Sequence, residues 1–396
     1  MLGPHDIEAR PSPRGSRRGN MKPHRADGGR APSMDRVPGL DLLRAAAILL
    51  VLLEHQELIS GRPTPTGLLG VDLFFVLSGF LIGGILFDMG GNLRRPRIVL
   101  GFWLRRWLRT LPNYYLFLAI NILVWLPFYR PHVVQRVVPP YLVFFQSFAH
   151  RPSWFFVESW SLCVEEWFYV FFPLALWAGL ILGQRFVRAF WVTVAAMMLV
   201  SLSLRIAAPP PKDWGMDIGM VVVYKFDALA WGALAAAALR MWPRFWARFR
   251  RPAGAAGLLI VIACFVFQLR HDMGASFFAK SFFPTVITLG WALALPWASG
   301  CTHLKGAWFS RSVAAVARWS YSLYLVNFLV SVLIALYLMP LLGRGPWGIA
   351  AGEIIFLAVI FAASAFLYRW YEGPILRRRS RIALCREAAV AQGSRS

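Results

Sequence analysis

Arg44 and His55 stand inside one apolar stretch of the sequence, residues 39–60. Charged groups are costly in a bilayer, so they usually face a protein interior or a water-filled cavity, and they mark a function. The spacing from Arg44 to His55 is close to three helical turns, which puts both side chains on one helix face, about 16 Å apart. The stretch therefore predicts a membrane-spanning helix with a cation near one surface and an imidazole near the other.

Carboxylates occur in three further apolar stretches. Asp72 opens one, Glu165 and Glu166 stand together in a second, and Asp227 follows Lys225 in a third. A buried carboxyl can act as a general acid or base, or it can orient an imidazole. The structural alternatives stay open: a glutamate can pair with a buried cation, and Lys225 can pair with Asp227. Glu165 and Glu166 point about 100° apart on a helix, so at most one of them faces a given site.

A basic segment with interleaved aromatic residues covers residues 94–109. Arg105 and Arg109 are four positions apart and share a helix face with one another, and Arg106 lies beside them. Arginine forks bind phosphate bidentately, and aromatic rings could stack on a nucleobase. The alternative is a cluster that only sets the orientation of the chain in the membrane.

The composition identifies an all-α membrane protein rather than a soluble one. The chain has 396 residues, of which 58% are hydrophobic, and its mean hydropathy is +0.54. The net charge of +23 does not indicate nucleic-acid binding, because the Lys and Arg residues lie in short segments beside apolar runs, as the positive-inside rule describes. The four cysteines form no CxxC pair, so they predict packed thiols and no metal site.

Ten apolar stretches predict a polytopic bundle of about ten transmembrane helices. With both termini in the cytoplasm, 31 of the 42 Lys and Arg residues fall on cytoplasmic segments and 10 on outer ones. Residues 1–36 are expected to form a disordered basic tail, residues 37–375 the transmembrane domain, and residues 376–396 a second basic tail. The stretches cover residues 39–60, 67–89, 111–128, 160–183, 187–207, 218–240, 254–270, 281–299, 314–339 and 347–370.

This topology predicts two clusters of functional side chains. His55, Asp72, Asp227 and one of the paired glutamates all lie near the outer ends of their helices, where they could meet at one level. Arg44 and the Arg105–Arg109 group lie on the cytoplasmic side. The sequence therefore suggests one channel, with a phosphate-binding mouth inside and an acid–base centre near the outside.

Taken together, the motifs resemble those of the acyltransferase-3 family, the integral-membrane O-acyltransferases. One motif alone is weak, but their order and spacing over residues 38–375 make the match specific. The likeness rests on five stretches: the Arg44-x10-His55 pair, GVDLFFVLSGFLI at 70–82, the arginine-rich stretch 102–115, WSLCVEEWFYVFFP at 160–173 and SYSLYLVNF at 320–328.

The resemblance implies an acyl-CoA co-substrate, with acetyl as the expected acyl group, and an alcohol acceptor. It implies that His55 is the essential base, that Arg44 is the other essential member of its motif, and that Arg105, Arg106 and Arg109 hold the CoA phosphates. His55 would take the acceptor's hydroxyl proton, with Glu165 or Asp72 orienting the imidazole. A histidine nucleophile that carries the acyl group is the less favoured alternative.

Two positions depart from the family pattern. Lysine stands at 225 where relatives often have arginine, and it lacks the guanidinium fork. Asn327 stands where histidine is usual, and an amide does not titrate near neutral pH. The hydroxyls and the amide of residues 320–327 are expected to form interhelical hydrogen bonds. Some relatives carry a C-terminal esterase-like domain, which we do not expect in this chain.

The leading hypothesis is an O-acyltransferase of the bacterial inner membrane that acts on a carbohydrate or lipid-linked glycan, in contact with membrane lipids and without nucleic acid. The rival is a proton-coupled secondary transporter that uses the same buried charges. A transporter would need broken helices and repeat symmetry, of which the sequence shows little. A non-catalytic scaffold would leave Arg44 and His55 unexplained.

Overall fold

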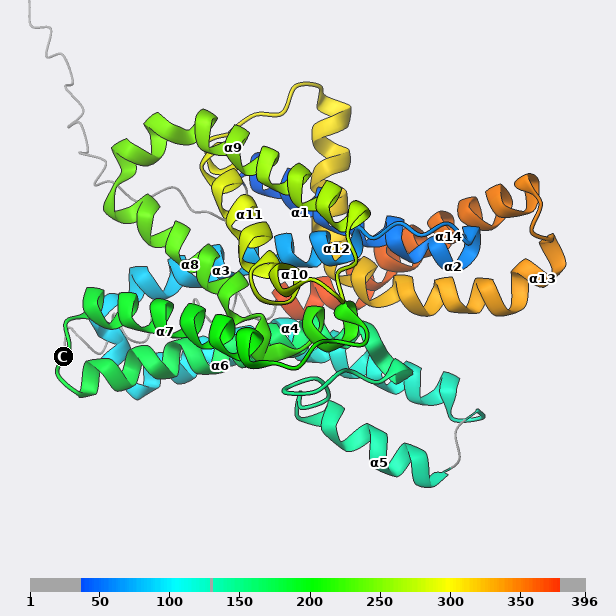
Figure 1. The fold of residues 1–396 in the computed structure, drawn as a ribbon, viewed down its shortest axis with the longest axis horizontal. Coiled ribbons are helices and arrows are strands. Elements are labelled where there is room, and N and C mark those ends of the chain that lie inside the picture. Colours follow the sequence, from blue (N-terminus) through cyan, green and yellow to red (C-terminus); the bar gives the residue numbers. More distant parts are fainter. Residues whose placement is uncertain (1–36, 129–130, 378–396) are drawn as a thin grey trace, which may run out of the picture. The chain divides into compact units, whose positions relative to one another are not determined.

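Helices form every regular element in the computed structural model, which describes residues 37–128 and 131–377 (Figure 1). Both predicted tails therefore lie almost wholly outside the described residues. The α-helices are α1 (Pro38–His55), α2 (Glu57–Ser60), α3 (Gly67–Met89), α4 (Pro96–Trp125), α5 (Pro131–Leu142), α6 (Trp160–Ile181), α7 (Phe186–Ala207), α8 (Phe226–Met241), α9 (Pro243–Arg270), α10 (Phe277–Ser281), α11 (Phe283–Ser299), α12 (Ala307–Leu333), α13 (Met339–Leu342) and α14 (Pro346–Leu367).

Shorter 3₁₀ and π segments join or extend these helices. They are η2 (Gly90–Arg94), η3 (Trp154–Ser159), η4 (Gly215–Gly219), η5 (Val222–Tyr224), η6 (Ile334–Leu338) and η7 (Tyr368–Glu372). Among the described residues, six helical segments are long and apolar enough to cross a membrane, so the chain is a multi-pass membrane protein. These segments are Gly67–Arg94, Trp154–Ile181, Phe186–Ala207, Pro243–Arg270, Ala307–Leu342 and Pro346–Arg377.

Three expected boundaries differ from the structure. The stretch 39–60 divides into α1 and α2 at Gln56, so His55 is the last residue of its helix. The helix expected over 218–240 begins only at Phe226, because the chain before it forms the short segments η4 and η5. The basic segment 94–109 lies mostly inside α4, a continuous helix that also contains most of the stretch expected at 111–128 and ends at Trp125.

Helices α3 and α8 approach one another closely because glycine removes side chains from their interface. A β-carbon on Gly79 would collide with the backbone of Leu229, and one on Gly232 would collide with the backbone carbonyl of Val76. Small residues let membrane helices pack backbone against backbone, where lipid offers little hydrophobic driving force. This contact fixes the position of α3, which forms one wall of the site described below.

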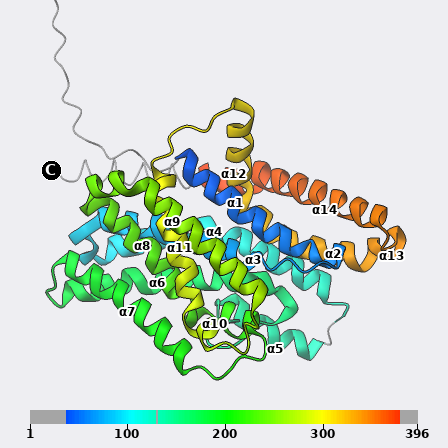
Figure 2. The ribbon, with the colours of Figure 1, turned by 45° about the horizontal axis from the view of Figure 1, so that its top comes forward.

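Helix α1 lies beside α3 and α12, as Figure 2 shows for α12. The connection from α2 to α3 folds back along the end of α1. Thr64 and Thr66 each donate a hydroxyl hydrogen bond of 2.8 Å, to the backbone carbonyls of Leu53 and Leu50. The last four carbonyls of a helix have no partner in the helix. Thr64 satisfies one of them, that of Leu53, and Thr66 adds a second bond to the carbonyl of Leu50, which lies before this last turn. The end of α1, where His55 stands, is thereby held in place.

Candidate active site

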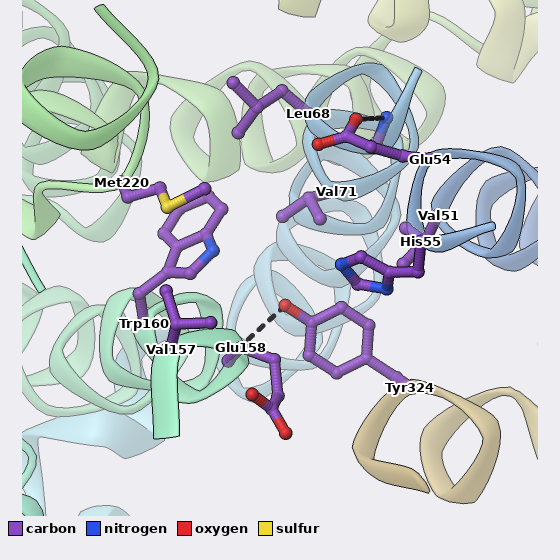
Figure 3. Close-up of a pocket in the computed structure, with 11 residues that line it drawn as sticks. Val51, Glu54, His55, Leu68, Val71, Val157, Glu158, Trp160, Met220 and Tyr324 are labelled. Atoms are coloured by element: carbon purple, nitrogen blue, oxygen red, sulfur yellow. Dashed lines mark hydrogen bonds between the residues drawn. The ribbon is translucent and has the colours of Figure 1, made fainter. Parts of the chain in front are cut away.

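His55 lies on the wall of a pocket between α1, α3, η3, α6 and α12 (Figure 3). The pocket has an empty volume of about 360 Å³, part of it open to solvent. Figure 3 shows the imidazole directed into this space, with Trp160 across from it and Tyr324 beside it. The lining residues are Val51, Glu54, His55, Gly67, Leu68, Val71, Val157, Glu158, Trp160, Met220 and Tyr324.

The imidazole of His55 is held by two residues of α12. Its Nδ1 is hydrogen-bonded to Oδ1 of Asn327, whose side chain is fully buried. The ring of Phe328 packs edge-on against the imidazole, with 5.2 Å between ring centroids. Asn327 also donates from Nδ2 to the backbone carbonyls of Leu323, at 2.9 Å, and Tyr324, at 2.7 Å. An amide, and not Glu165 or Asp72, is therefore the side chain hydrogen-bonded to His55.

Two carboxylates line the pocket, and they differ in their partners. Glu54 accepts a hydrogen bond from the backbone N–H of Gly67, at the start of α3, where the helix dipole favours a negative charge. Glu158 is 3% exposed, and neither oxygen of its carboxylate accepts a hydrogen bond from any residue that the structure describes. Buried polar atoms are usually satisfied, so Glu158 is an exception on the wall of the pocket.

Tyr324 ties three elements of the pocket together. Its hydroxyl donates to the backbone carbonyl of Glu158 at 2.9 Å, and it accepts from the Ser161 hydroxyl at 2.7 Å. The interhelical hydrogen bonding expected for the motif at 320–328 is confirmed at this residue. It fixes η3 and the start of α6 against α12.

Asp72 does not line the pocket. Its carboxylate accepts from Nζ of Lys225 at 2.8 Å, and both side chains are buried. Lys225 therefore does not pair with Asp227, the alternative left open above. Asp227 instead forms a bidentate pair with the fully buried Arg205, with N–O distances of 2.7 and 3.0 Å. We call Asp72, Arg205, Lys225 and Asp227 the buried ion-pair group.

Glu165 and Glu166 also have partners away from His55, and they face different ways, as their helical spacing requires. Glu165 accepts from the Tyr169 hydroxyl at 2.8 Å, and Tyr169 is hydrogen-bonded to Ser78 at 2.7 Å. Glu166 accepts from the Thr110 hydroxyl at 2.5 Å. His55, Asp72, Asp227 and one of the paired glutamates were expected to meet at one level, but the structure divides them into separate groups.

The arginines lie on two helices. Arg44 of α1 pairs with Asp41, one turn earlier, at 3.1 Å. On α4, Arg106 is buried and its guanidinium lies over the ring of Phe102, whereas Arg109 is exposed and Arg105 is partly buried. The positive charges of Arg106 and Arg109 attract the carboxylate of Glu165. The structure therefore connects the arginines of α4 with Glu165, a residue expected beside His55.

Two residues around the site were missed by the sequence analysis, as was the partner of a third. Glu158 directly precedes the motif at 160–173, and its acidic type inside an aromatic run was the available signal. Glu54 stands next to His55 in the sequence but was not singled out. Asn327 was expected to form an interhelical hydrogen bond, as an amide in an apolar helix usually does, but His55 was not foreseen as its partner.

The fold and the site define a class of protein when they are compared with known families. A sequence model of a protein family, described as an acyltransferase domain, matches residues 37–370, which is most of the chain. The chain therefore belongs to the acyltransferase-3 family.

Curated relatives match part of this domain. O-acetyltransferase OatA of Staphylococcus aureus is 32% identical over 189 residues, which is 43% of this chain and 29% of the relative. Peptidoglycan O-acetyltransferase OatA of Listeria monocytogenes is 27% identical over 187 residues, 40% of this chain and 29% of the relative. YrhL of Bacillus subtilis is 29% identical over 228 residues, 52% of this chain and 33% of the relative. The matched segments thus span about a third of these relatives, and no solved structure matches the chain.

Proposed function

We propose that this protein transfers an acetyl group from acetyl-CoA to a hydroxyl of an envelope carbohydrate or lipid-linked glycan, with His55 as the general base. The observation that carries the proposal is the pocket around His55 inside a domain of the acyltransferase-3 family. The acetyl group and the carbohydrate acceptor come from the names of the relatives, which are O-acetyltransferases, one of them of peptidoglycan. Family membership favours this enzyme over the proton-coupled transporter.

The transfer needs one proton acceptor, and His55 is the residue of the pocket best suited to it. The acceptor's O–H bond breaks as its proton moves to the imidazole, and the oxygen bonds to the thioester carbonyl carbon. The C–S bond then breaks, and the leaving thiolate takes the proton back from the imidazolium. Trp160 and Tyr324 offer aromatic surfaces against which a sugar could pack in the same pocket.

The donor would be held by the arginines. We place the phosphates of acyl-CoA at Arg44, Arg105, Arg106 and Arg109, because guanidinium forks suit phosphate oxygens. Two groups of hydrogen-bonded side chains join α4, α6 and α3 in this part of the protein. Thr110 donates to Glu166, and Tyr169 bonds to both Glu165 and Ser78.

The same proposal places the chain in the bacterial inner membrane with about ten crossings and both termini in the cytoplasm. The excess of Lys and Arg on the segments assigned to the cytoplasm supports this orientation. It puts the arginines of α4 on the side where acyl-CoA is made.

Mass spectrometry of envelope and secreted glycans, with and without the gene, tests the function. We expect a fixed mass difference of one acetyl group per modified sugar, and the same loss when His55→Gln replaces the wild-type gene. Membrane vesicles with isotope-labelled acetyl-CoA should place the label on the same glycan. Identical glycan spectra from both strains would contradict the proposal.

The donor site has its own test. Replacing Arg105, Arg106 and Arg109 by Ala should raise KM for acetyl-CoA at least about tenfold, because hydrogen bonds to charged groups contribute about 1.5–3 kcal/mol each. KM for acetyl-pantetheine, which lacks the nucleotide phosphates, should stay unchanged. The matched control replaces the exposed Arg94, Arg95 and Arg97. Since Arg106 is buried, the double variant of Arg105 and Arg109 is measured too, and an unchanged KM in both variants would assign the cluster to topology alone.

A further inference from the structure

We propose that Asn327 is the positioning residue that fixes the tautomer of His55, so that Nε2 is the nitrogen that takes the proton. This inference rests on the proposed role of His55 as the base. It assigns a function to the position at which the chain departs from its family's usual histidine. The argument depends on the hydrogen bonds of one amide group.

The amide of Asn327 can adopt only one orientation in this site. An amide nitrogen has two N–H donors, and Nδ2 of Asn327 uses them on the carbonyls of Leu323 and Tyr324. Both acceptors are backbone oxygens, which cannot donate. A flipped amide would place its own oxygen against those two carbonyl oxygens. Oδ1 is therefore the atom that faces His55.

The orientation of the amide determines where the proton of His55 lies. Oδ1 is an acceptor without a proton, so Nδ1 must carry the hydrogen of the bond between them. A neutral imidazole has one N–H and one nitrogen with a free lone pair, and the hydrogen bond at one nitrogen sets the state of the other. Nε2 of neutral His55 is consequently unprotonated.

The ring's position puts that lone pair where an acceptor can reach it. Figure 3 shows the ring nitrogen farther from the backbone pointing into the pocket. Phe328 packs edge-on against the imidazole and restricts its rotation. The other titratable groups that line the pocket are Glu54, Glu158 and Tyr324, and among the described residues the side-chain partner of His55 is Asn327 rather than either glutamate. Asn327 is thus the residue that sets the tautomer.

Two variants of similar size separate this role from simple packing. Asn327→Leu removes the acceptor, so the imidazole can exchange tautomers, and we expect kcat to fall at least about tenfold. Asn327→Asp keeps an acceptor at the same place and adds a negative charge, but its second oxygen replaces the nitrogen that donates to the carbonyls of Leu323 and Tyr324. Its transfer is therefore compared with the wild type per amount of folded protein. It should retain substantial activity while the acidic limb of its pH–rate profile moves to higher pH, because the carboxylate stabilises the imidazolium. Ser331→Ala, one turn further along α12, is the packing control.

The tautomer itself is measured by ¹⁵N NMR of histidine-labelled protein, with His55→Gln used to assign the His55 signals. We expect a protonated Nδ1 and an unprotonated Nε2 in the wild type, and a mixture in Asn327→Leu. A protonated Nε2 in the wild type, or wild-type kcat in Asn327→Leu, would overturn the inference. The NMR result does not depend on activity. If His55 takes no part in the reaction, the His55→Gln variant should transfer the acetyl group at the full rate. That measurement tests the proposed function separately from the tautomer.

Discussion

The ionisable side chains of the buried ion-pair group and those of the His55 pocket differ in how completely they are paired. In the ion-pair group, Arg205 donates to both oxygens of Asp227, to Thr285 and to two backbone carbonyls, and Lys225 pairs with Asp72. In the pocket, the carboxylate of Glu158 has no hydrogen-bond partner among the described residues, and His55 has an amide partner. Satisfied charges hold helices together, whereas His55 keeps one ring nitrogen directed into the pocket (Figure 3).

The difference corrects the expectation that buried charge alone marks a catalytic residue. Asp72 and His55 both looked costly in the sequence, and both lie inside the protein. Only His55 faces a pocket. The distinction between the two regions can be tested by removing one charge or one polar group from each.

The largest effect should come from His55. His55→Gln keeps a similar shape but removes the base, and positioned general bases contribute about 10²–10⁴ in rate. The variant should show that loss in acetyl transfer to the glycan. Its melting temperature and its elution in detergent should match the wild type, since the charge is not needed for folding. Full transfer by this variant would remove His55 from the chemistry.

The second effect belongs to the ion-pair group and concerns stability. Asp227→Asn leaves Arg205 without its counter-charge, and breaking one partner of a buried pair costs about 3–5 kcal/mol. We expect little folded protein in thermal size-exclusion measurements. The control is Asp88→Asn, because Asp88 pairs with Arg240 and its side chain is 62% exposed. An exposed pair contributes about 0–1 kcal/mol, so equal melting temperatures for the two variants would erase the distinction.

The smallest effect should have the opposite sign. Glu158→Gln replaces a carboxylate without hydrogen-bond partners by a neutral group of the same shape. It should raise stability slightly, because it removes a buried charge while the amide that replaces it still lacks hydrogen-bond partners. Glu165→Gln is the comparison, because its oxygen already accepts from Tyr169, and it should not gain stability. A Glu158→Gln variant that melts below the wild type would show that its carboxylate has a structural role.

The sequence was sufficient for much of the fold. Long apolar runs predict α3, α6, α7, α9, α12 and α14, because a helix that crosses a bilayer needs about 20 apolar residues regardless of its neighbours. The start of α8 was not predictable in this way. Residues 218–225 are as apolar as a helix, yet the backbone around Lys225 leaves the helical region so that its side chain can reach Asp72.

The pairing of charges was harder to predict than their presence. Arg205 was counted with an outer loop, but it lies inside α7 and is fully buried against Asp227. Which charge meets which depends on the order in which helices pack, and hydropathy carries no information on that order. That Arg44 and His55 lie on one face of the same helix was predictable, because the geometry of a single helix fixes it. The contact between His55 and Asn327 was not, since 272 positions separate them.

The glycine contact between α3 and α8 has a consequence for how the chain tolerates change. Gly79 and Gly232 face backbone atoms of the opposite helix, which cannot move aside as a flexible side chain could. Selection for activity from a random library at these two positions should return glycine almost exclusively. Lipid-facing positions of α9, such as Leu259, 67% exposed, should accept any large apolar residue. The chemistry at His55 would thus depend on two residues that have no functional group at all.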